Sequence, residues 1–226
     1  MTLAATMSAA EQLAELNRQA DVLVARGYPA LAGLPDDGFR SLARRLEALL
    51  PAAPFVLVVS GALVPPMHLI QHVVLDGKQG FTTMPDDDIA RFVPTADLSI
   101  PDAPVYLAAD VDTGQQTLGV RPDDALAMIH AAGRTPLTLN EGLAVAVQHP
   151  EWLRERNCFE MLGSRAGDKR VTGLWLSNGA PRLGWCWGGN PHTWLGMASA
   201  ARRIGWARAG PRVPLAGARV ARSGRF

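Results

Sequence analysis

The stretch VTGLWLSNGAPRLGWCW at 171–187 decides how the C-terminal part of the chain folds. It consists of two mostly apolar runs, Val171–Ser177 and Pro181–Trp187, separated by Asn178-Gly179. An Asn-Gly pair accepts the positive φ angles of the tight turn that joins two antiparallel strands. The stretch therefore predicts a β-hairpin, and this hairpin carries three of the six tryptophans in the chain.

Upstream of the hairpin, the sequence predicts a small mixed sheet. Phe55–Val59 is a continuous apolar run, of the kind found in strands that are buried on both faces. Leu69–Leu75 and Val105–Ala109 are further strand candidates, and each is followed by turn-forming residues.

Two helices are predicted before this sheet. Ser8 and Glu11 have the spacing of a capping box, in which each side chain satisfies a free backbone N–H, and the helix runs to Gly27. A second helix is expected over residues 36–50, because its leucines recur on one face and Pro51 ends it.

A central pair of helices is predicted before the hairpin. Pro122 opens the first helix of the pair, which stops at Gly133. Thr138 and Glu141 form the capping box of the second, which ends before Pro150. The elements together predict an α+β fold with two N-terminal helices, a small mixed sheet, a central helical pair and a Trp-rich C-terminal β-hairpin.

Composition excludes several classes of protein. The 226 residues are 48% apolar, enough to form a sizeable core, and the net charge of +1 gives no overall attraction to nucleic acid or anionic membranes. Two cysteines are too few for a disulfide framework. Prolines interrupt the uncharged stretch 48–75, so no membrane-spanning helix is expected. Without a secretory signal at the N-terminus, we expect a cytoplasmic protein, and its oligomeric state is left open.

The charge is unevenly distributed along the chain. We expect residues 1–204 to form a single α+β domain, with a subdivision near residue 115 or 150 left open, followed by a basic Arg/Gly/Pro tail at 205–226. Residues 201–226 hold seven arginines and no acidic residue. Such a tail attracts nucleic acid or an acidic protein. An interaction module that uses the surface and this tail is therefore an alternative function.

The leading functional hypothesis is a small-molecule pocket around residues 182–196. Indole rings provide apolar walls with an N–H donor, and glycines let the backbone approach a ligand closely. The arginines are expected to hold an anion, and His192 is the candidate acid or base for any chemistry there. No cofactor is predicted. The expected ligand-binding residues are Arg165, Arg182, Trp185, Trp187, Asn190, His192 and Trp194.

Two weaker hypotheses involve thiols and metals. Cys158 and Cys186 are weak zinc candidates together with His192, because neither cysteine belongs to a C-x₂-C pair, and Cys158 with His192 would alternatively form a thiol nucleophile and its base. Asp110-x-Asp112 resembles the first motif of haloacid-dehalogenase-type phosphatases and the metal-binding Asp-x-Asp of nucleotide-sugar glycosyltransferases. This resemblance implies a Mg²⁺-dependent phosphoryl- or glycosyl-transfer enzyme that uses both aspartates.

Longer segments resemble an uncharacterised actinobacterial family, a domain of unknown function. The resemblance extends over about 27–196 and brings no known activity, cofactor or catalytic residue. Three segments carry it: GRTPLT at 133–138, LGSRAGD at 162–168 and GWCWGGNPHTWLG at 184–196.

Overall fold

The computed structural model describes residues 6–154 and 157–206 of the chain, which has an α+β fold. The predicted tail residues 207–226 lie outside the described part. No helix in the described part is long and apolar enough to cross a membrane. The helices are α1 (Ala9–Ala25), α2 (Tyr28–Leu31), α3 (Asp36–Arg44), α4 (Asp86–Ala90), α5 (Pro122–Ala131) and α6 (Leu139–Gln148), with 3₁₀ turns at Glu47–Leu49, Pro66–His68, Ile70–His72, Gln115–Thr117 and Pro150–Trp152.

The strands form two main sheets and two small ribbons. One sheet is entirely antiparallel, in the order β1-β6-β13-β7, and the other is mixed, in the order β12-β8-β10-β11-β4. The strands are β1 (Phe55–Val59), β2 (Val74–Leu75), β3 (Lys78–Gln79), β4 (Phe81–Thr82), β5 (Val93–Pro94), β6 (Val105–Asp112), β7 (Thr135–Pro136), β8 (Cys158–Met161), β9 (Ser164–Arg165), β10 (Arg170–Ser177), β11 (Ala180–Trp187), β12 (Leu195–Met197) and β13 (Ser199–Ile204).

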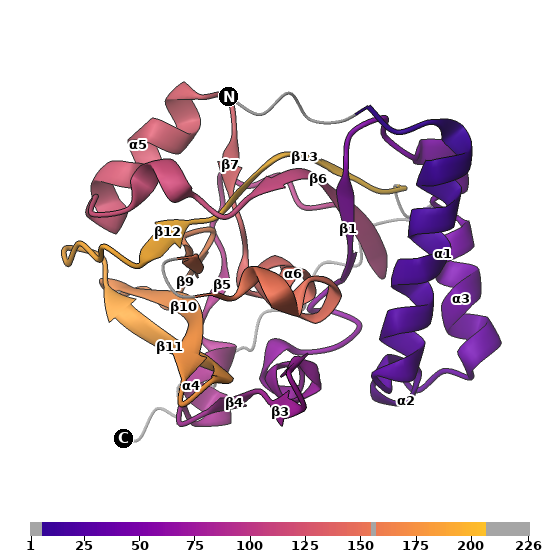
Figure 1. Cartoon of the computed structure of the whole chain (residues 1–226), viewed down its shortest axis with the longest axis horizontal. Helices are drawn as coiled ribbons and strands as arrows, with labels where there is room; N and C mark the ends of the chain where they lie inside the picture. The colour runs from indigo at the N-terminus through magenta and orange to yellow at the C-terminus, as the bar shows by residue number, and fades with distance from the viewer. Residues whose placement is uncertain (1–5, 155–156, 207–226) are drawn as a thin grey trace, which may run out of the picture.

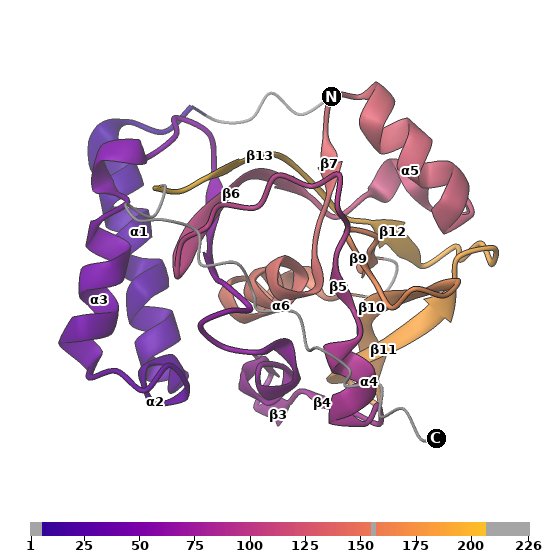
Figure 2. The same cartoon turned by 180° about the vertical axis from the view of Figure 1, so that it is seen from behind.

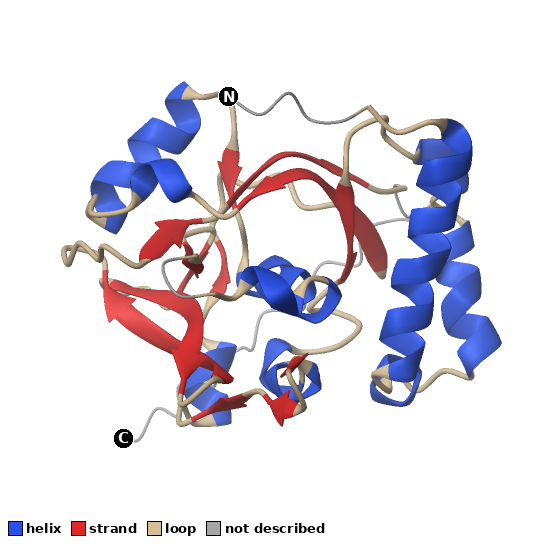
Figure 3. Ribbon diagram, viewed as in Figure 1, coloured by secondary structure: helices blue, strands red, loops and turns tan. Residues whose placement is uncertain are grey.

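Helix α6 lies at the centre of the molecule, between the two sheets (Figure 1; Figure 3). Nine of its ten residues are buried, which is the pattern of a helix that has core on every side. Gly142 allows a close approach, because a Cβ atom there would lie 2.4 Å from Cγ of Met161 on β8. The view from behind places α1 and α3 at one end of the molecule and α5 at the other (Figure 2).

A buried ion pair connects α6 to the antiparallel sheet. Arg203 on β13 donates from Nε to Glu141 Oε1 at 2.6 Å and from Nη2 to Glu141 Oε2 at 2.8 Å. The Tyr106 hydroxyl on β6 donates to the same carboxylate at 3.0 Å. The Glu141 side chain also completes the predicted capping box with Thr138. Because both charges are buried and paired, removing one partner leaves a costly unpaired charge in the core.

The N-terminal helices agree with the sequence prediction in part. The capping box of Ser8 and Glu11 is present. Inside α1, Gln19 donates to the Phe55 carbonyl and accepts from the Leu57 N–H, so its amide covers the open edge of β1. The second helix is shorter than predicted. It ends at Arg44 and not at residue 50, and the chain continues as tighter 3₁₀-type turns before Pro51.

The predicted hairpin is confirmed as β10 and β11, which pair from Arg170↔Trp187 to Ser177↔Ala180. Asn178 and Gly179 have φ angles of 53° and 75°, as a tight Asn-Gly turn requires. The sequence predicted a mixed sheet upstream of this hairpin, whereas in the structure the hairpin itself is part of the mixed sheet. The expected strand 69–75 is wrong: it consists of 3₁₀ turns and only the two-residue strand β2, because the preceding prolines set up tight turns.

Residues at the end of the described part pack onto the fold. Gly205 lies so close to the body that a Cβ atom would be 2.7 Å from Cβ of Pro101. The Trp206 ring lies under the Arg45 guanidinium, at 4.1 Å from its centroid. Residues 205–206 are thus held against the body of the protein, whereas the sequence places them in the predicted tail.

Candidate metal centre

Three side chains of the kinds that ligate metals meet in the mixed sheet: Glu160 on β8, Cys186 on β11 and His192 in the loop before β12. Each offers one ligand atom, and these atoms all lie within 4.8 Å of one another. Among the residues that the structure describes, this is the one group of three or more such side chains at metal-ligand spacing. We call it the Glu-Cys-His cluster.

The strand register explains why Glu160 and Cys186 meet. Both β8 and β11 pair with β10, so that Gly173 lies opposite Glu160 on one side and opposite Gly184 on the other. Side chains two apart on a strand share a face, and hence Cys186 shares a face with Gly184 and Glu160. The two glycines make room on that face for the Trp175 ring, because a Cβ atom on Gly184 would lie only 2.3 Å from it.

The loop that carries His192 is held in place by backbone hydrogen bonds. The Gly188 N–H donates to the Lys169 carbonyl at 2.8 Å, and the Gly119 N–H donates to the His192 carbonyl at 2.8 Å. The imidazole ring also contacts the Trp194 ring, with centroids 5.4 Å apart. Trp194 in turn meets Trp175 edge-on at 6.0 Å. His192 is therefore positioned by contacts on both its backbone and its ring.

Glu160 is the unusual member of the cluster. It is fully buried, and neither of its carboxyl oxygens has a hydrogen-bond partner among the described residues. Burial raises its pKa to about 8, against the smaller opposing effects of the Cys186 thiol and the Arg165 charge. The thiol is close enough to affect the carboxyl group, but its geometry is not that of a hydrogen bond. A buried carboxyl group without a partner is costly, and its presence calls for an explanation.

Cys186 and His192 share this environment. Burial and the adjacent Glu160 carboxyl group raise the pKa of the Cys186 thiol to about 12. Burial lowers the pKa of His192, and its Nε2 atom is buried without a partner. The neutral thiol is a poor nucleophile, so the cluster does not favour thiol catalysis. The cluster can bind a metal ion only if the ion displaces the protons of Glu160 and Cys186.

The sheet divides the predicted pocket residues between its two faces. Arg182 lies on the cluster face, where its guanidinium stacks over Trp175 at 5.6 Å and donates to Thr83 Oγ1 at 3.2 Å. Trp185 and Trp187 lie on the opposite face and contact each other edge-on at 5.0 Å. These two indoles therefore do not line a site together with Arg182 and His192.

The other predicted residues lie nearer to the cluster. Trp194 contacts His192 directly, whereas Asn190 is exposed in the turn that follows β11, where its N–H donates to the Trp187 carbonyl. Arg165 on β9 is mostly buried and lies close enough for its charge to lower the pKa of Glu160. The structure thus brings Arg165, His192 and Trp194 to the cluster.

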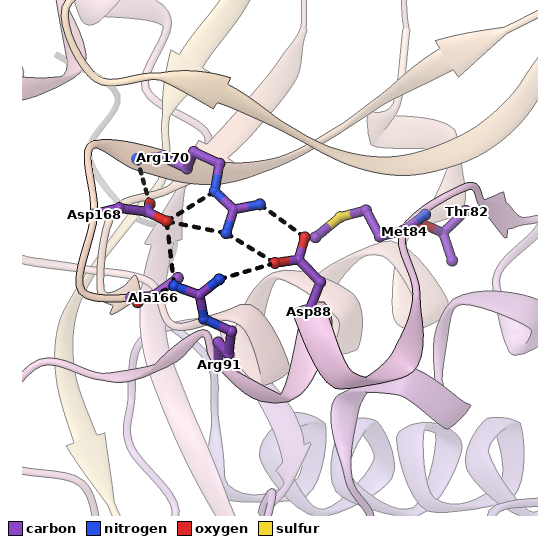
Figure 4. Close-up of polar contacts among 7 residues, drawn as sticks. All are labelled: Thr82, Met84, Asp88, Arg91, Ala166, Asp168 and Arg170. Carbon is purple, nitrogen blue, oxygen red and sulfur yellow. Dashed lines mark hydrogen bonds and ion pairs between the residues drawn. The ribbon is translucent and has the colours of Figure 1, made fainter.

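Arg170, at the start of β10, binds two carboxylates (Figure 4). It forms a two-pronged ion pair with Asp88 at 2.7 and 2.8 Å and a further bond to Asp168 at 3.0 Å. Arg91 bridges the same two carboxylates. These carboxylates hold the pKa of Arg170 above its usual value. The network attaches the loop before β10 to α4 and engages all three guanidinium nitrogens of Arg170 with carboxylates.

The remaining predicted metal candidates lie apart from the cluster. The Cys158 thiol is buried and donates to the Arg154 carbonyl at 3.4 Å. Asp110 forms an ion pair with Arg134 at 2.8 Å, and Asp112 accepts the Gly114 N–H at 2.7 Å. These contacts satisfy both carboxylates within the fold. No observation in the described residues favours a Mg²⁺ site at the Asp-x-Asp motif.

Sequence analysis missed Glu160 and Trp175. The signal for Glu160 was present, since a single acid stands in the otherwise apolar strand CFEM, all four residues of which are buried. Trp175 lies in the predicted hairpin, but its position over Gly184 depends on the register. Both residues become informative only when β8, β10 and β11 are aligned.

Comparison with known proteins gives a family without a known activity. No curated protein and no solved structure matches the chain. One family model matches residues 22–206, a range that includes every member of the Glu-Cys-His cluster and all strands of both main sheets. The match confirms the expected membership in a domain family of unknown function. The chain belongs to the family of unknown function DUF5701.

Proposed function

We propose that this protein binds a zinc ion through Glu160, Cys186 and His192, and that the bound ion is its functional centre. One observation carries the proposal. Three different ligand groups converge within 4.8 Å in a buried place where the carboxyl oxygens and His192 Nε2 have no partner. A bound ion would supply the missing partner to both Glu160 and His192 and would take Cys186 as its third ligand.

Charge balance supports a divalent ion. When the ion displaces their protons, Glu160 and Cys186 contribute two negative charges, and His192 binds as a neutral ring. A doubly charged cation then makes the buried centre neutral, which removes the cost of burying separate charges. Ligand atoms within 4.8 Å require only small adjustments to reach the distances of about 2.0–2.3 Å that zinc adopts to nitrogen, oxygen and sulfur.

The ligand types favour zinc over harder cations. Thiolate sulfur is a soft ligand that Mg²⁺ and Ca²⁺ avoid, whereas imidazole and thiolate together suit zinc. Three protein ligands also leave one of the four usual zinc positions vacant, as in catalytic zinc sites. The proposal therefore keeps the expectation that a small molecule binds in this region, but moves its centre from the tryptophan walls to a metal ion.

Equilibrium dialysis with metal analysis tests the proposal. The purified, metal-stripped protein is dialysed against micromolar ZnCl₂ in the presence of millimolar MgCl₂. We expect one zinc per chain for the unaltered protein. Losing a ligand should cost at least the 10- to 100-fold in affinity that is typical of losing a supporting contact. Glu160→Gln, Cys186→Ser and His192→Gln should each show this loss.

Cys158→Ser is the matched control. Cys158 is a buried cysteine on the same strand as Glu160, but it lies outside the cluster. Its replacement should leave zinc affinity unchanged in a folded protein. If the unaltered chain retains no zinc, or if the three cluster variants bind zinc as tightly as the control, the proposal is wrong.

A further inference from the structure

We propose that the zinc centre binds the oxyanion of a small molecule, a carboxylate or phosphate, with Arg165 as its second anchor. This inference rests on the proposed function and specifies the ligand of the same site. One anion oxygen would occupy the vacant zinc position, and the Arg165 guanidinium would bind another. Three features support this arrangement: the single long ion pair of Arg165, the contacts that the other arginines nearby already make, and the residues at the rim of the site.

Arg165 is a mostly buried cation with unused donors. Its side chain is 22% exposed, and its one ion pair is a long contact of 3.6 Å from Nη2 to Asp123 Oδ1. Among the described residues it makes no side-chain hydrogen bond of normal geometry. A guanidinium carries five N–H donors in a planar fork that suits a carboxylate or phosphate. Among the described residues the only ion-pair partner of Arg165 is the long contact to Asp123, so its fork is available to an oxyanion.

The other arginines near the mixed sheet differ from Arg165. Arg170 is bound by Asp88 and Asp168, as described above. Arg182 shares the cluster face but lies four residues from Cys186 along β11, which separates them by about 13 Å, and it is already stacked over aromatic rings. Arg182 also has a buried Nε atom without a partner, but of these three arginines only Arg165 has a charge that acts on Glu160.

Asp123 marks the rim of the site and competes with the ligand. It lies in the first turn of α5, and its N–H donates to the Gly188 carbonyl at 3.1 Å, next to the loop that carries His192. Its carboxylate is largely exposed and holds Arg165 only loosely. An entering oxyanion would take over the guanidinium from Asp123. The exposed Trp194, which contacts His192, offers an apolar surface to the rest of the ligand.

Cobalt substitution makes anion binding visible. The full-length protein is loaded with Co²⁺, whose visible absorption reports its ligands, and is titrated with sodium acetate and separately with sodium phosphate. Acetamide serves as the neutral control. We expect a saturable spectral change with at least one of the two anions and none with acetamide. A change with acetate alone identifies a carboxylate ligand, and one with phosphate alone identifies a phosphate ligand.

Substitutions then test the role of Arg165. Arg165→Gln should weaken anion affinity by about 10- to 100-fold, the usual effect of losing a charge-assisted pair, while cobalt still binds. Arg165→Lys keeps the charge without the fork and should give an intermediate loss. Asp123→Asn should tighten binding because it removes the competitor. Arg182→Gln, on the sheet face that carries the Glu-Cys-His cluster, should leave anion affinity unchanged.

The outcomes separate this inference from the proposed function. If cobalt binds one per chain but neither anion changes its spectrum at 100 mM, zinc binding stands and the oxyanion inference is wrong. The oxyanion inference is also wrong if anion affinity is equal in the unaltered protein, Arg165→Gln and Arg165→Lys. If cobalt and zinc both fail to bind, the proposed function fails and the inference with it.

Discussion

Replacing Glu160 with glutamine should change how the stability of the metal-free protein depends on pH. In the folded chain, burial raises the pKa of Glu160 to about 8, whereas an unfolded glutamate titrates near its ordinary pKa of 4.5. Between these two values the unfolded state releases the proton and the folded state keeps it. Raising the pH through this range therefore favours unfolding. The stabilisation is complete below pH 4.5 and is lost once the pH has risen through about 8.

The size of the effect follows from the pKa difference. Each pH unit between the two pKa values costs the folded state about 1.4 kcal/mol. Glu160 is fully buried, so solvent does not screen this contribution. From pH 5.5 to pH 7.5 the unaltered protein should lose about 2–3 kcal/mol more unfolding free energy than Glu160→Gln, whose amide does not titrate.

Urea unfolding in the presence of EDTA measures this difference. Unfolding free energies of both proteins are determined at several values between pH 5 and pH 9. Glu47→Gln, which changes an exposed glutamate, controls for charge alone and should behave as the unaltered protein. If the curves for the unaltered protein and for Glu160→Gln run parallel over this range, Glu160 is not the buried, unpartnered acid described above.

Two further substitutions test the fold around the site. Arg203→Met leaves the buried Glu141 carboxylate without its ion pair and should cost about 3–5 kcal/mol of unfolding free energy by urea titration, whereas the exposed Arg202→Met should cost little. Gly184→Ala places a Cβ atom 2.3 Å from an indole carbon of Trp175 and should cost about 1–3 kcal/mol of unfolding free energy. In the control variant Gly189→Ala, the new Cβ atom meets nothing within 4 Å. Equal thermal stability of these two variants would refute the packing of Trp175 over the glycine pair.

Local signals in the sequence were sufficient for the helices and the hairpin. The capping boxes at Ser8 and Thr138 mark their helices because their hydrogen bonds are made within one turn. The Asn178-Gly179 turn fixes the register of the hairpin in the same way. The end of α3 was not predictable from Pro51, because a chain is free to leave the α-helix for 3₁₀ turns before it reaches a proline.

The candidate site depended on contacts that are distant in sequence. The strand period of two already implied that Arg182 lies on one face and that Trp185 and Trp187 lie on the other, so the prediction of one pocket for these three residues overlooked a local rule. The partner of Cys186 was a different matter. Glu160 reaches it only because β8 and β11 both pair with β10, and no local pattern specifies that strand order.

X-ray absorption spectroscopy at the zinc edge tests the central claim most directly. For the zinc-loaded protein we predict one sulfur neighbour at about 2.3 Å, from Cys186, together with nitrogen and oxygen neighbours at about 2.0–2.2 Å. The sulfur signal should disappear in Cys186→Ser and persist in Cys158→Ser. A zinc ion surrounded only by nitrogen and oxygen in the unaltered protein, or a sulfur signal that survives in Cys186→Ser, would contradict the assignment of the Glu-Cys-His cluster as the metal centre.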